Sequence, residues 1–349
     1  MRIRGGLVRG VLAMTSVVAL IVGGGCRSSA PAAVVATIDH HVHIIGPGLL
    51  RDWASVGVEF SHEPAHYATV SGLMAGTSAG GSLRRAVLVP MAHLYGNDEF
   101  REAMGLTVDE EARRVAAEND HVAADAARFP GRATPLCAVD FRRPYALDEI
   151  IRCRRDHPGS GIKLHFASAG FDFRDEAAFG ALERIMALAA SDGIPVLVHL
   201  DPQHRGLEAE DVRRVIDRLL LPHPDLVVNI AHLGGSGGCG PWMRTVMGTF
   251  HEWLDEEAAA GRGRPGVYFD ISAVILDEPS HGVPASSDED LVALAPLLRE
   301  VGLRRIVFGS DHPVFDPQRT AAAWAARSGL TRAELARVLS NRIPGLTEG

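Results

Sequence analysis

The sequence comprises 349 residues, of which 46% are hydrophobic and 22% are charged, and its formal net charge at pH 7 is −8. These proportions are typical of a globular protein with a hydrophobic core rather than of a disordered chain. The acidic balance argues against a nucleic-acid partner, because binding to phosphates requires a basic surface.

The N-terminus reads as an export signal. Three arginines precede the apolar run GVLAMTSVVALIV, which is short for a membrane span. It continues into GGGCRSSAPAA, which resembles a bacterial lipoprotein signal whose cysteine becomes the lipidated first residue. We therefore predict a signal peptide over residues 1–25, lipidation of Cys26 and a short linker over residues 26–33. Ordinary cleavage near residues 30–33 and an uncleaved anchor remain as alternatives. The expected location is the periplasm of the bacterial cell envelope, with membrane contact only through such an anchor.

Eight short apolar runs alternate with amphipathic helical patterns in the rest of the chain. The runs span residues 34–44, 85–92, 133–141, 161–166, 194–200, 226–233, 266–273 and 305–311. Their continuous apolarity suits strands that are covered on both faces, as in a parallel sheet. Eight such alternations predict an α/β fold, a (β/α)8 TIM barrel, as one catalytic domain over residues 34–349. Residues 45–84 are expected to form a loop over the barrel mouth and one helix.

Polar residues stand in the closing positions of these apolar runs: His41, His43, Lys163, His165, His199, His232, Asp270 and Asp311. Active sites of this fold lie at the carboxyl ends of the strands, so these side chains are expected to meet. Their burial among apolar residues would be costly unless something pairs with them. Several imidazoles that converge with a carboxylate indicate a divalent metal site, and zinc is the natural occupant.

Lys163 is the only lysine among 35 basic residues. Arginine is the basic residue at all the other positions, so a lysine here suggests chemistry that a guanidinium does not perform. A buried lysine can lose its proton, or react with CO2 to form a carbamate that bridges two metals. The alternative interpretation is a remnant of codon bias.

Three cysteines remain after the signal: Cys137, Cys153 and Cys239. An odd number leaves at least one of them unpaired, and their spacing does not match a metal knuckle. Buried structural thiols are the expected outcome.

The motifs DHHVH, GIKLH, VLVH, AHLGG and FGSDHP, in this order and on the expected strands, resemble the amidohydrolase superfamily. The resemblance is nearest to its amidohydrolase-related branch of metal-dependent TIM-barrel hydrolases, and it extends over about residues 34–345. It implies a divalent metal cofactor, most simply one or two Zn²⁺ per chain.

The resemblance also implies metal ligands. His41 and His43 would bind the first metal together with Asp311. His199 would complete a site for one metal, or would join His232 on a second metal. Lys163 occupies the position of the carboxylated lysine in members that hold two metals.

Further roles follow from the same resemblance. Asp311 would accept the proton of a metal-activated water and pass it to the leaving group. His232, if it does not bind metal, would polarise the substrate carbonyl. His165 and Asp270 are assigned to the substrate-binding wall of the site, and Asp39 would orient a ligand histidine by accepting its other N–H.

Other residues near the predicted mouth have weaker patterns. Arg142 and Arg143 follow the third strand and could bind a substrate carboxylate, although a surface position is the preferred interpretation. His93 and His204 follow the second and fifth strands and could line the pocket.

Three functions stay open at this point. The first is a hydrolase that cleaves an amide, lactone or ester-type bond of a small molecule, which Lys163 favours. The second is a metal-dependent decarboxylase or hydratase of the same superfamily. The third is an exported metal-binding protein without catalysis, which would hold its metal in a closed site. The sequence does not identify the substrate or the oligomeric state.

Overall fold

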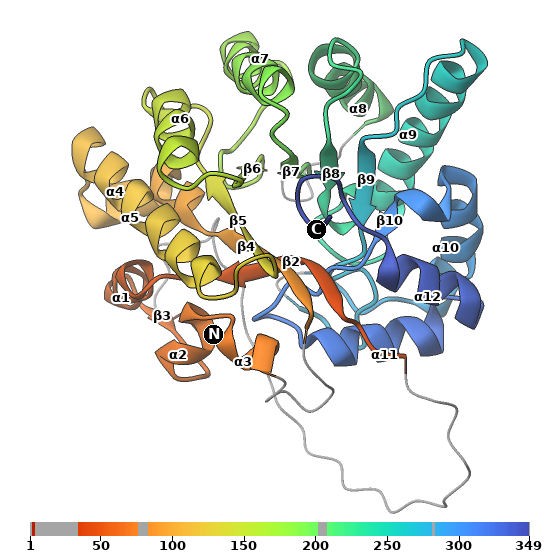
Figure 1. Ribbon diagram of the computed structural model, residues 1–349, viewed down its shortest axis with the longest axis horizontal. Helices are drawn as coiled ribbons and strands as arrows, with labels where there is room; N and C mark the ends of the chain where they lie inside the picture. The colour runs from red at the N-terminus through yellow and green to blue at the C-terminus, as the bar shows by residue number, and fades with distance from the viewer. Residues whose placement is uncertain (1, 4–33, 76–82, 202–207, 281–282, 349) are drawn as a thin grey trace, which may run out of the picture.

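The computed structural model describes residues 2–3, 34–75, 83–201, 208–280 and 283–348. Its centre is an eight-stranded parallel sheet with the order β10-β9-β8-β7-β6-β5-β4-β2 (Figure 1). The strands are β2 (Ile38–Ile44), β4 (Arg85–Pro90), β5 (Ala133–Ala138), β6 (Gly161–His165), β7 (Val196–His199), β8 (Val228–Ile230), β9 (Val267–Asp270) and β10 (Ile306–Val307). Each predicted apolar run therefore contains one strand.

The two outer strands of this order meet and close the barrel. The backbone N–H of His40 donates to the carbonyl of Phe308 at 2.9 Å, and that of His43 donates to the carbonyl of His312 at 2.7 Å. A parallel bridge joins Val42 to His312. These bonds between β2 and the segment that follows β10 confirm the predicted (β/α)8 barrel.

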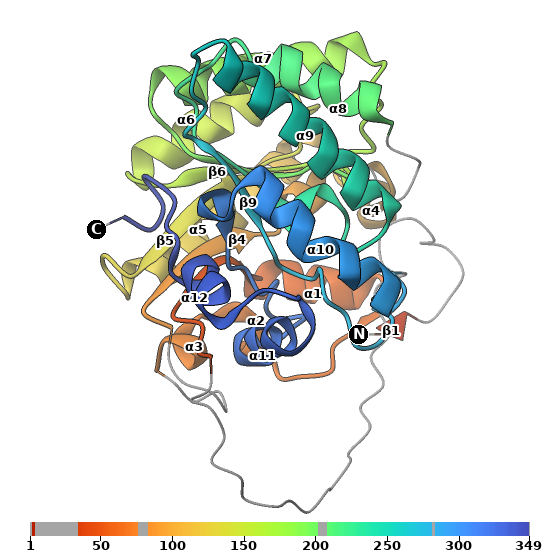
Figure 2. The same cartoon turned by 90° about the vertical axis from the view of Figure 1, so that its right-hand side faces the viewer.

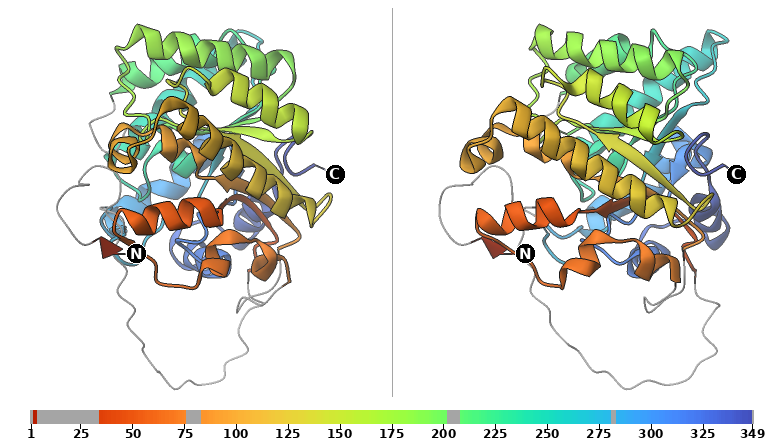
Figure 3. Two further views of the ribbon diagram at one scale, coloured as in Figure 1. Left: turned by 90° about the vertical axis from the view of Figure 1, so that its left-hand side faces the viewer. Right: turned by 60° about the vertical axis from the view of Figure 1, so that its left-hand side comes forward.

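Helices surround the barrel (Figures 1 and 2). The outer layer comprises α4 (Asp98–Met104), α5 (Val108–Ala127), α6 (Ala146–Asp156), α7 (Glu176–Ser191), α8 (Ala209–Val215), α9 (Pro241–Ala259), α10 (Asp288–Val301), α11 (Pro317–Arg327) and α12 (Arg332–Ser340). Several of their N-termini carry side-chain caps. Thr107 and Glu110 form a capping box on α5, and the Asp175 side chain accepts from the first turn of α7. Figure 3 shows α5 and α6 along the outside of the neighbouring strands.

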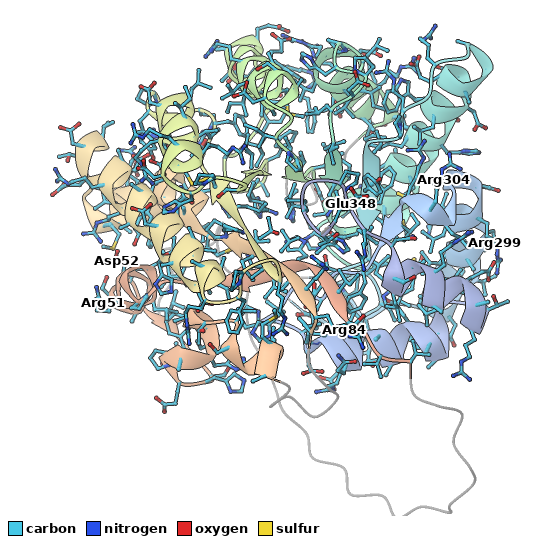
Figure 4. All side chains as sticks on the ribbon, viewed as in Figure 1. Arg51, Asp52, Arg84, Arg299, Arg304 and Glu348 are labelled. Carbon is cyan, nitrogen blue, oxygen red and sulfur yellow. A yellow bond between two sulfur atoms is a disulfide. The ribbon has the colours of Figure 1, made fainter. Side chains whose placement is uncertain are left out.

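Short helical segments join several of these elements: η1 (Ala92–Gly96), η2 (Ile216–Leu220), η3 (Ala231–Gly234) and η4 (Leu303–Arg305). Charged side chains project from the outside of the molecule, among them Arg51 in the segment after β2 and Arg299 on α10, which lie away from the barrel centre (Figure 4). The apolar faces of the same helices pack on the strands, as Phe179 and Ile185 of α7 do in the main core cluster.

The connection between the first two barrel strands is more structured than predicted. Instead of a loop and one helix it contains α1 (Pro47–Ser55), β3 (Val58–Glu59), α2 (Pro64–Ala68) and α3 (Ser71–Ala75). β3 pairs antiparallel with β1 (Arg2–Ile3). The helices are short, and their few buried residues did not give a helical period long enough to recognise.

The predicted export signal, Cys26 and the linker over residues 26–33 fall almost entirely outside the described residues. Among the helices of the described part, none has the length and hydrophobicity that a membrane crossing requires.

The amino end of the barrel is filled by apolar side chains. Strand residues Val87, Leu136 and Leu197 form a buried cluster with Ile343 and Leu346, which come from the last residues of the chain. Figure 1 shows this C-terminal segment near the centre of the ring of strands. The barrel is thus sealed at one end, and polar groups gather at the other.

The cysteines differ in part from the expectation. Cys137 on β5 and Cys153 on α6 form a disulfide, so the prediction of buried thiols is wrong for this pair. A strand followed by its covering helix brings the two positions together, with the Cα atoms 6.2 Å apart. Cys239 is free and buried.

Candidate metal centre

The carboxyl ends of the strands bring the predicted polar residues to one mouth. His41 and His43 lie on β2, His165 ends β6, His199 ends β7 and Asp270 ends β9. The register of β6 and β7 places His165 directly beside His199. The convergence expected from the barrel is therefore present.

One compact group consists of His41, His43 and Asp311, whose potential ligand atoms all lie within 4.8 Å of one another. Asp311 Oδ1 lies 3.3 Å from His43 Nε2 and 3.6 Å from His41 Nε2. The Asp311 backbone N–H donates to the His41 carbonyl at 2.9 Å, which fixes this residue beside β2. Two imidazole nitrogens and a carboxylate oxygen in this arrangement can hold a divalent cation.

A second group joins His41 and His232 to Asp270. The Asp270 carboxylate accepts from His41 Nδ1 at 3.1 Å, from Asn229 Nδ2 at 3.0 Å and from the His232 backbone N–H at 3.1 Å. Ser272 also donates to it. Because these donors occupy both oxygens, Asp270 supports the site from behind and has no free atom for a substrate, contrary to the predicted substrate contact.

The charge of Asp270 is maintained by its partners. Burial alone would raise the pKa of this carboxyl, but His41, His232 and Ser272 lower the pKa below its usual value. An ionised Asp270 holds the Nδ1 proton of His41, so that His41 Nε2 is directed to the compact group. Carboxylate partners of this kind commonly orient ligand histidines.

Asp39 does not have the role predicted for it. Its Oδ1 accepts from the backbone N–H groups of His41 and Ser310, each at 3.0 Å, and within the described residues it forms no hydrogen bond with an imidazole ring. Burial raises the pKa of Asp39 to about 7, although hydrogen bonds from Ser310 and His41 partly oppose this. Asp39 ties the backbone of β2 to the segment after β10, whereas Asp270 orients the ring of His41.

Six imidazoles follow one another around the mouth, and we call them the histidine arc: His43, His41, His232, His199, His165 and His93. Neighbouring ring centroids are 4.0 to 5.0 Å apart. Burial lowers the pKa of His41 to about 4 and lowers the pKa of His93, His165 and His199 well below the usual value. These rings are neutral at pH 7, which is the form that binds metal.

Lys163 lies fully buried beside this arc. Its Nζ has no hydrogen-bond partner among the described residues. Burial lowers the pKa of Lys163 to about 8, although Asp270 and Asp311 partly oppose this shift. His41 Nε2 and both ring nitrogens of His93 are likewise buried without a partner in that part of the chain. Orphaned buried nitrogens are costly, and bound groups would satisfy them. The donor set therefore fits a metal centre.

The predicted metal residues are not all equally close. His41, His43, Asp311 and His232 belong to the two compact groups, whereas His199 belongs to neither. His199 nevertheless reaches the centre through its ring contact with His232, at a centroid distance of 5.0 Å.

Arg142 and Arg143 are engaged elsewhere. Arg142 pairs with Asp140 at 2.9 Å and with Asp98 at 3.2 Å, and Arg143 pairs with Glu111 at 2.7 Å. Neither guanidinium is available in this arrangement for a substrate carboxylate. His204 lies outside the described residues.

Two residues contribute more to the site than the sequence indicated. His93 lies in η1, directly after β4, and it is fully buried. Ser272 follows β9, and its Oγ lies 3.2 Å from His41 Nδ1 and 2.8 Å from His232 Nδ1. Both residues lie just beyond a strand end, and this position could have marked them as candidates in the sequence. The alternation of side chains along a strand does not continue into such turns, so it did not predict their direction.

Backbone strain also gathers at the mouth. Among the described residues, the non-glycine residues with positive φ are His232, Leu233, Ala273 and Asp311, and all follow strand ends. Such conformations are uncommon and tend to occur at functional sites. Gly234 in the AHLGG motif has a φ of 88°, and a Cβ there would lie 2.2 Å from Val246 Cγ1. The positive φ and the close packing of α9 on this turn both favour glycine there.

Comparisons with known proteins agree with this architecture. The family model described as amidohydrolase matches residues 38–341. A 2,6-dihydroxybenzoate decarboxylase from Rhizobium aligns with a TM-score of 0.54 and 16% identity, over 87% of this chain and 96% of that chain. A dihydroxybenzoic acid decarboxylase from a Polaromonas species, with bound manganese and 2-nitroresorcinol, aligns with a TM-score of 0.56 and 14% identity, over 87% and 94%.

A third structure, of a candidate 2-pyrone-4,6-dicarboxylic acid hydrolase from Pseudomonas putida, aligns with a TM-score of 0.52 and 19% identity. The alignment covers 87% of this chain and 94% of that chain. At these identities the solved structures show the shared fold alone. No curated protein matches the sequence.

Proposed function

The chain belongs to the amidohydrolase family, and on that premise we propose that it is a metal-dependent hydrolase that cleaves an amide, lactone or ester-type bond of a small molecule. The observation that carries the proposal is the compact group of His41, His43 and Asp311, in which His41 Nε2 is buried without a hydrogen-bond partner. Such an atom is explained when a cation takes its lone pair.

The proposed cofactor is Zn²⁺, held by His41, His43 and Asp311. His199 and His232 would either complete this site or share a second cation with Lys163 in its carbamate form. A bound divalent cation supplies Lewis acidity and makes water nucleophilic near neutral pH. Imidazole and carboxylate ligands suit zinc, and they also suit other divalent transition metals.

Asp311 has the position and the charge of a proton acceptor. Burial would raise its pKa, but His43, His232 and His41 lower the pKa well below the usual value, so the carboxylate is ionised at neutral pH. Its side chain is 16% exposed at the mouth, where a water can reach it. We propose that Asp311 accepts the proton of the attacking water and returns it to the leaving group.

Two observations bear on the choice between hydrolysis and decarboxylation. The engagement of Arg142 and Arg143 with acidic residues removes two candidate anchors for a substrate carboxylate, which favours hydrolysis. By contrast, His199 lies outside both compact groups, which favours a single metal and keeps a decarboxylase as the second candidate. Hydrolysis remains the proposal because the buried, unpartnered Lys163 Nζ is explained by carboxylation.

Metal analysis of the purified protein and of Lys163→Ala tests this choice. We expect about two zinc ions per chain in the wild-type protein and one or none in the variant. One ion in both proteins would remove the bridged pair and favour the decarboxylase. A panel of lactones, amides and esters, assayed in parallel with CO2 release from hydroxybenzoates, then distinguishes the two reactions.

We also propose that the protein is exported and anchored through a lipid on Cys26. The Cys137–Cys153 disulfide supports an oxidising compartment, because such bonds persist there and are rare in the cytosol. Fractionation of cells that express the wild-type protein and Cys26→Ser tests the anchor. We expect the wild-type protein in the membrane fraction and the variant in the soluble periplasm; equal distribution of both would contradict it.

A further inference from the structure

The hydrogen bonds of the histidine arc determine where several ring protons lie. His41 Nδ1 faces the Asp270 carboxylate at 3.1 Å, His43 Nδ1 faces the Val89 carbonyl at 3.2 Å, and His232 Nδ1 faces the Ser272 carbonyl at 2.9 Å. Carbonyl and carboxylate oxygens only accept, and a neutral imidazole has one N–H. Nδ1 therefore carries a proton in all three rings. This leaves Nε2 as the nitrogen through which each ring can bind a metal.

His165 has the opposite arrangement. Its Nδ1 lies 3.2 Å from the backbone nitrogen of Ser168, which can only donate. In the neutral ring, Nδ1 is therefore the acceptor and Nε2 carries the proton. Nε2 has no hydrogen-bond partner among the described residues, and the side chain is partly exposed at the mouth. This histidine presents a donor where His41, His43 and His232 present lone pairs.

The stacking of His165 also separates it from the metal ligands. Its ring lies on that of His199 with a centroid distance of 4.0 Å and an interplanar angle of 9°. The nitrogen lone pairs of an imidazole lie in the ring plane, so two nearly parallel rings at this separation do not direct lone pairs at one ion. On the other side, His93 stacks on His165 at 4.7 Å and 24°. The ring is held on both faces, which fixes the direction of its Nε2–H.

We propose that His165 is a catalytic hydrogen-bond donor and that its Nε2–H binds an oxygen of the substrate, at a subsite distinct from the metal ligands. The substrate accordingly carries an acceptor oxygen on this side of the mouth, either a carbonyl or a carboxylate. This inference rests on the proposed function for its catalytic part, because a fixed neutral donor stabilises the oxyanion that forms during hydrolysis. It reassigns the polarising role predicted for His232, whose Nδ1 faces the Ser272 carbonyl.

The proton positions are measurable without a substrate. We propose ¹⁵N NMR of histidine-labelled, zinc-loaded protein, with the His165 signals assigned from their loss in His165→Gln. We expect a protonated Nε2 and a bare Nδ1 for His165, and protonated Nδ1 atoms for His41, His43 and His232. A bare Nε2 in His165 would overturn the proposal, even if the enzyme proved to be a hydrolase.

A matched pair of variants tests the subsite. His165→Gln retains an amide donor near the Nε2 position, whereas His165→Phe retains a ring that can stack on His199 but has no donor. Because His165 is not a metal ligand in this proposal, both variants should retain the wild-type zinc content. Loss of zinc from both variants would identify it as a ligand and would refute the assignment.

Two small probes identify the oxygen. Acetamide offers a carbonyl and acetate a carboxylate, and each is titrated while the Nε2–H signal of His165 is followed. We expect acetamide to shift this signal in the wild-type protein. In the variants, binding is followed through the ¹⁵N signals of the remaining histidines, and we expect it to be retained in His165→Gln and lost in His165→Phe. A response to acetate alone would assign the subsite to a carboxylate. No response to either probe would contradict an oxygen-binding donor. Absence of zinc from the wild-type protein would instead count against the proposed function.

Discussion

The two ends of the barrel are built from the same strands but satisfy their polar groups differently. At the amino end, Thr134 Oγ1 donates to the Leu346 carbonyl at 2.7 Å, and Thr347 Oγ1 lies 3.0 Å from His40 Nε2. At the carboxyl end, the buried atoms His41 Nε2 and Lys163 Nζ have no hydrogen-bond partner within the described part of the chain. The strained non-glycine residues lie at this same end.

The amino end therefore contributes mainly to stability, and the mouth contributes mainly to metal binding and catalysis. The amino end combines apolar packing with paired hydroxyl groups, which lowers the free energy of the folded state. The mouth retains orphaned nitrogens and positive φ angles, both of which cost free energy unless a bound group offsets them. Substitutions at the mouth should therefore affect activity and metal content, and substitutions at the amino end should affect unfolding.

The largest expected effect is that of Asp311→Asn at the mouth. Removal of the proton acceptor should lower kcat by about 10²–10⁴-fold, the usual contribution of general acid–base catalysis. Circular dichroism and the melting temperature should change little, because Asp311 packs at a partly exposed position. Asp225→Asn on an exposed turn is the control. Retained turnover in Asp311→Asn would refute its role as the base.

The opposite test is Leu136→Ala at the amino end. Leu136 is fully buried against Leu346, and truncation of such a side chain costs about 2–5 kcal/mol through lost burial and a residual cavity. Urea unfolding measures the loss, and zinc content per folded chain should remain unchanged. The exposed Leu221→Ala should alter stability by no more than about 0.5 kcal/mol. An equal loss of unfolding free energy in the two variants would show that packing at the amino end does not stabilise the protein more than an exposed side chain does.

A smaller effect is expected from Thr347→Val. His40 donates through Nδ1 to the Phe308 carbonyl, so its Nε2 accepts from the Thr347 hydroxyl. Removal of that hydroxyl leaves a buried acceptor unpaired, at a cost of about 1–3 kcal/mol. Thr347→Ser keeps the hydroxyl and should restore most of the stability. Chemical denaturation distinguishes the two, and no difference between them would mean that the hydrogen bond contributes nothing.

The last prediction concerns the pH dependence of stability at the rim of the mouth. Glu118 accepts from the Gly46 N–H, directly after β2, and burial raises its pKa to about 7 from a usual value of 4.5. Between these values the folded chain binds more protons than the unfolded chain, so stability falls as pH rises from about 4.5 to about 7. Glu118→Gln should remove this part of the slope. Parallel curves of unfolding free energy against pH for both proteins would contradict the shift.

Much of the fold was predictable because parallel strands are apolar on both faces and end in turns. Every predicted run contains one strand, and the polar residues at the run ends meet at the mouth. The segment between β2 and β4 was predicted less well. Its helices are short and are stabilised by contacts with the rest of the protein, which a local pattern does not record.

The roles of the two aspartates were not predictable in the same way. Alternation places Asp39 on the face of His41 and His43, but the register of β2 with β4 shifts between Asp39 and Val42. Asp39 consequently meets backbone N–H groups, and Asp270 from the distant strand β9 reaches the His41 ring. Ring protonation and the Cys137–Cys153 pairing are likewise set by neighbours that are far apart in sequence or lie in turns.

The position of Ile343 and Leu346 in the amino end of the barrel has a consequence for the folding of the ring of strands. These two residues lie far in sequence from Val87, Leu136 and Leu197, so the contacts between them close long stretches of chain. The ring therefore lacks part of its own interior until this distant segment docks, and before that step its base is open to water.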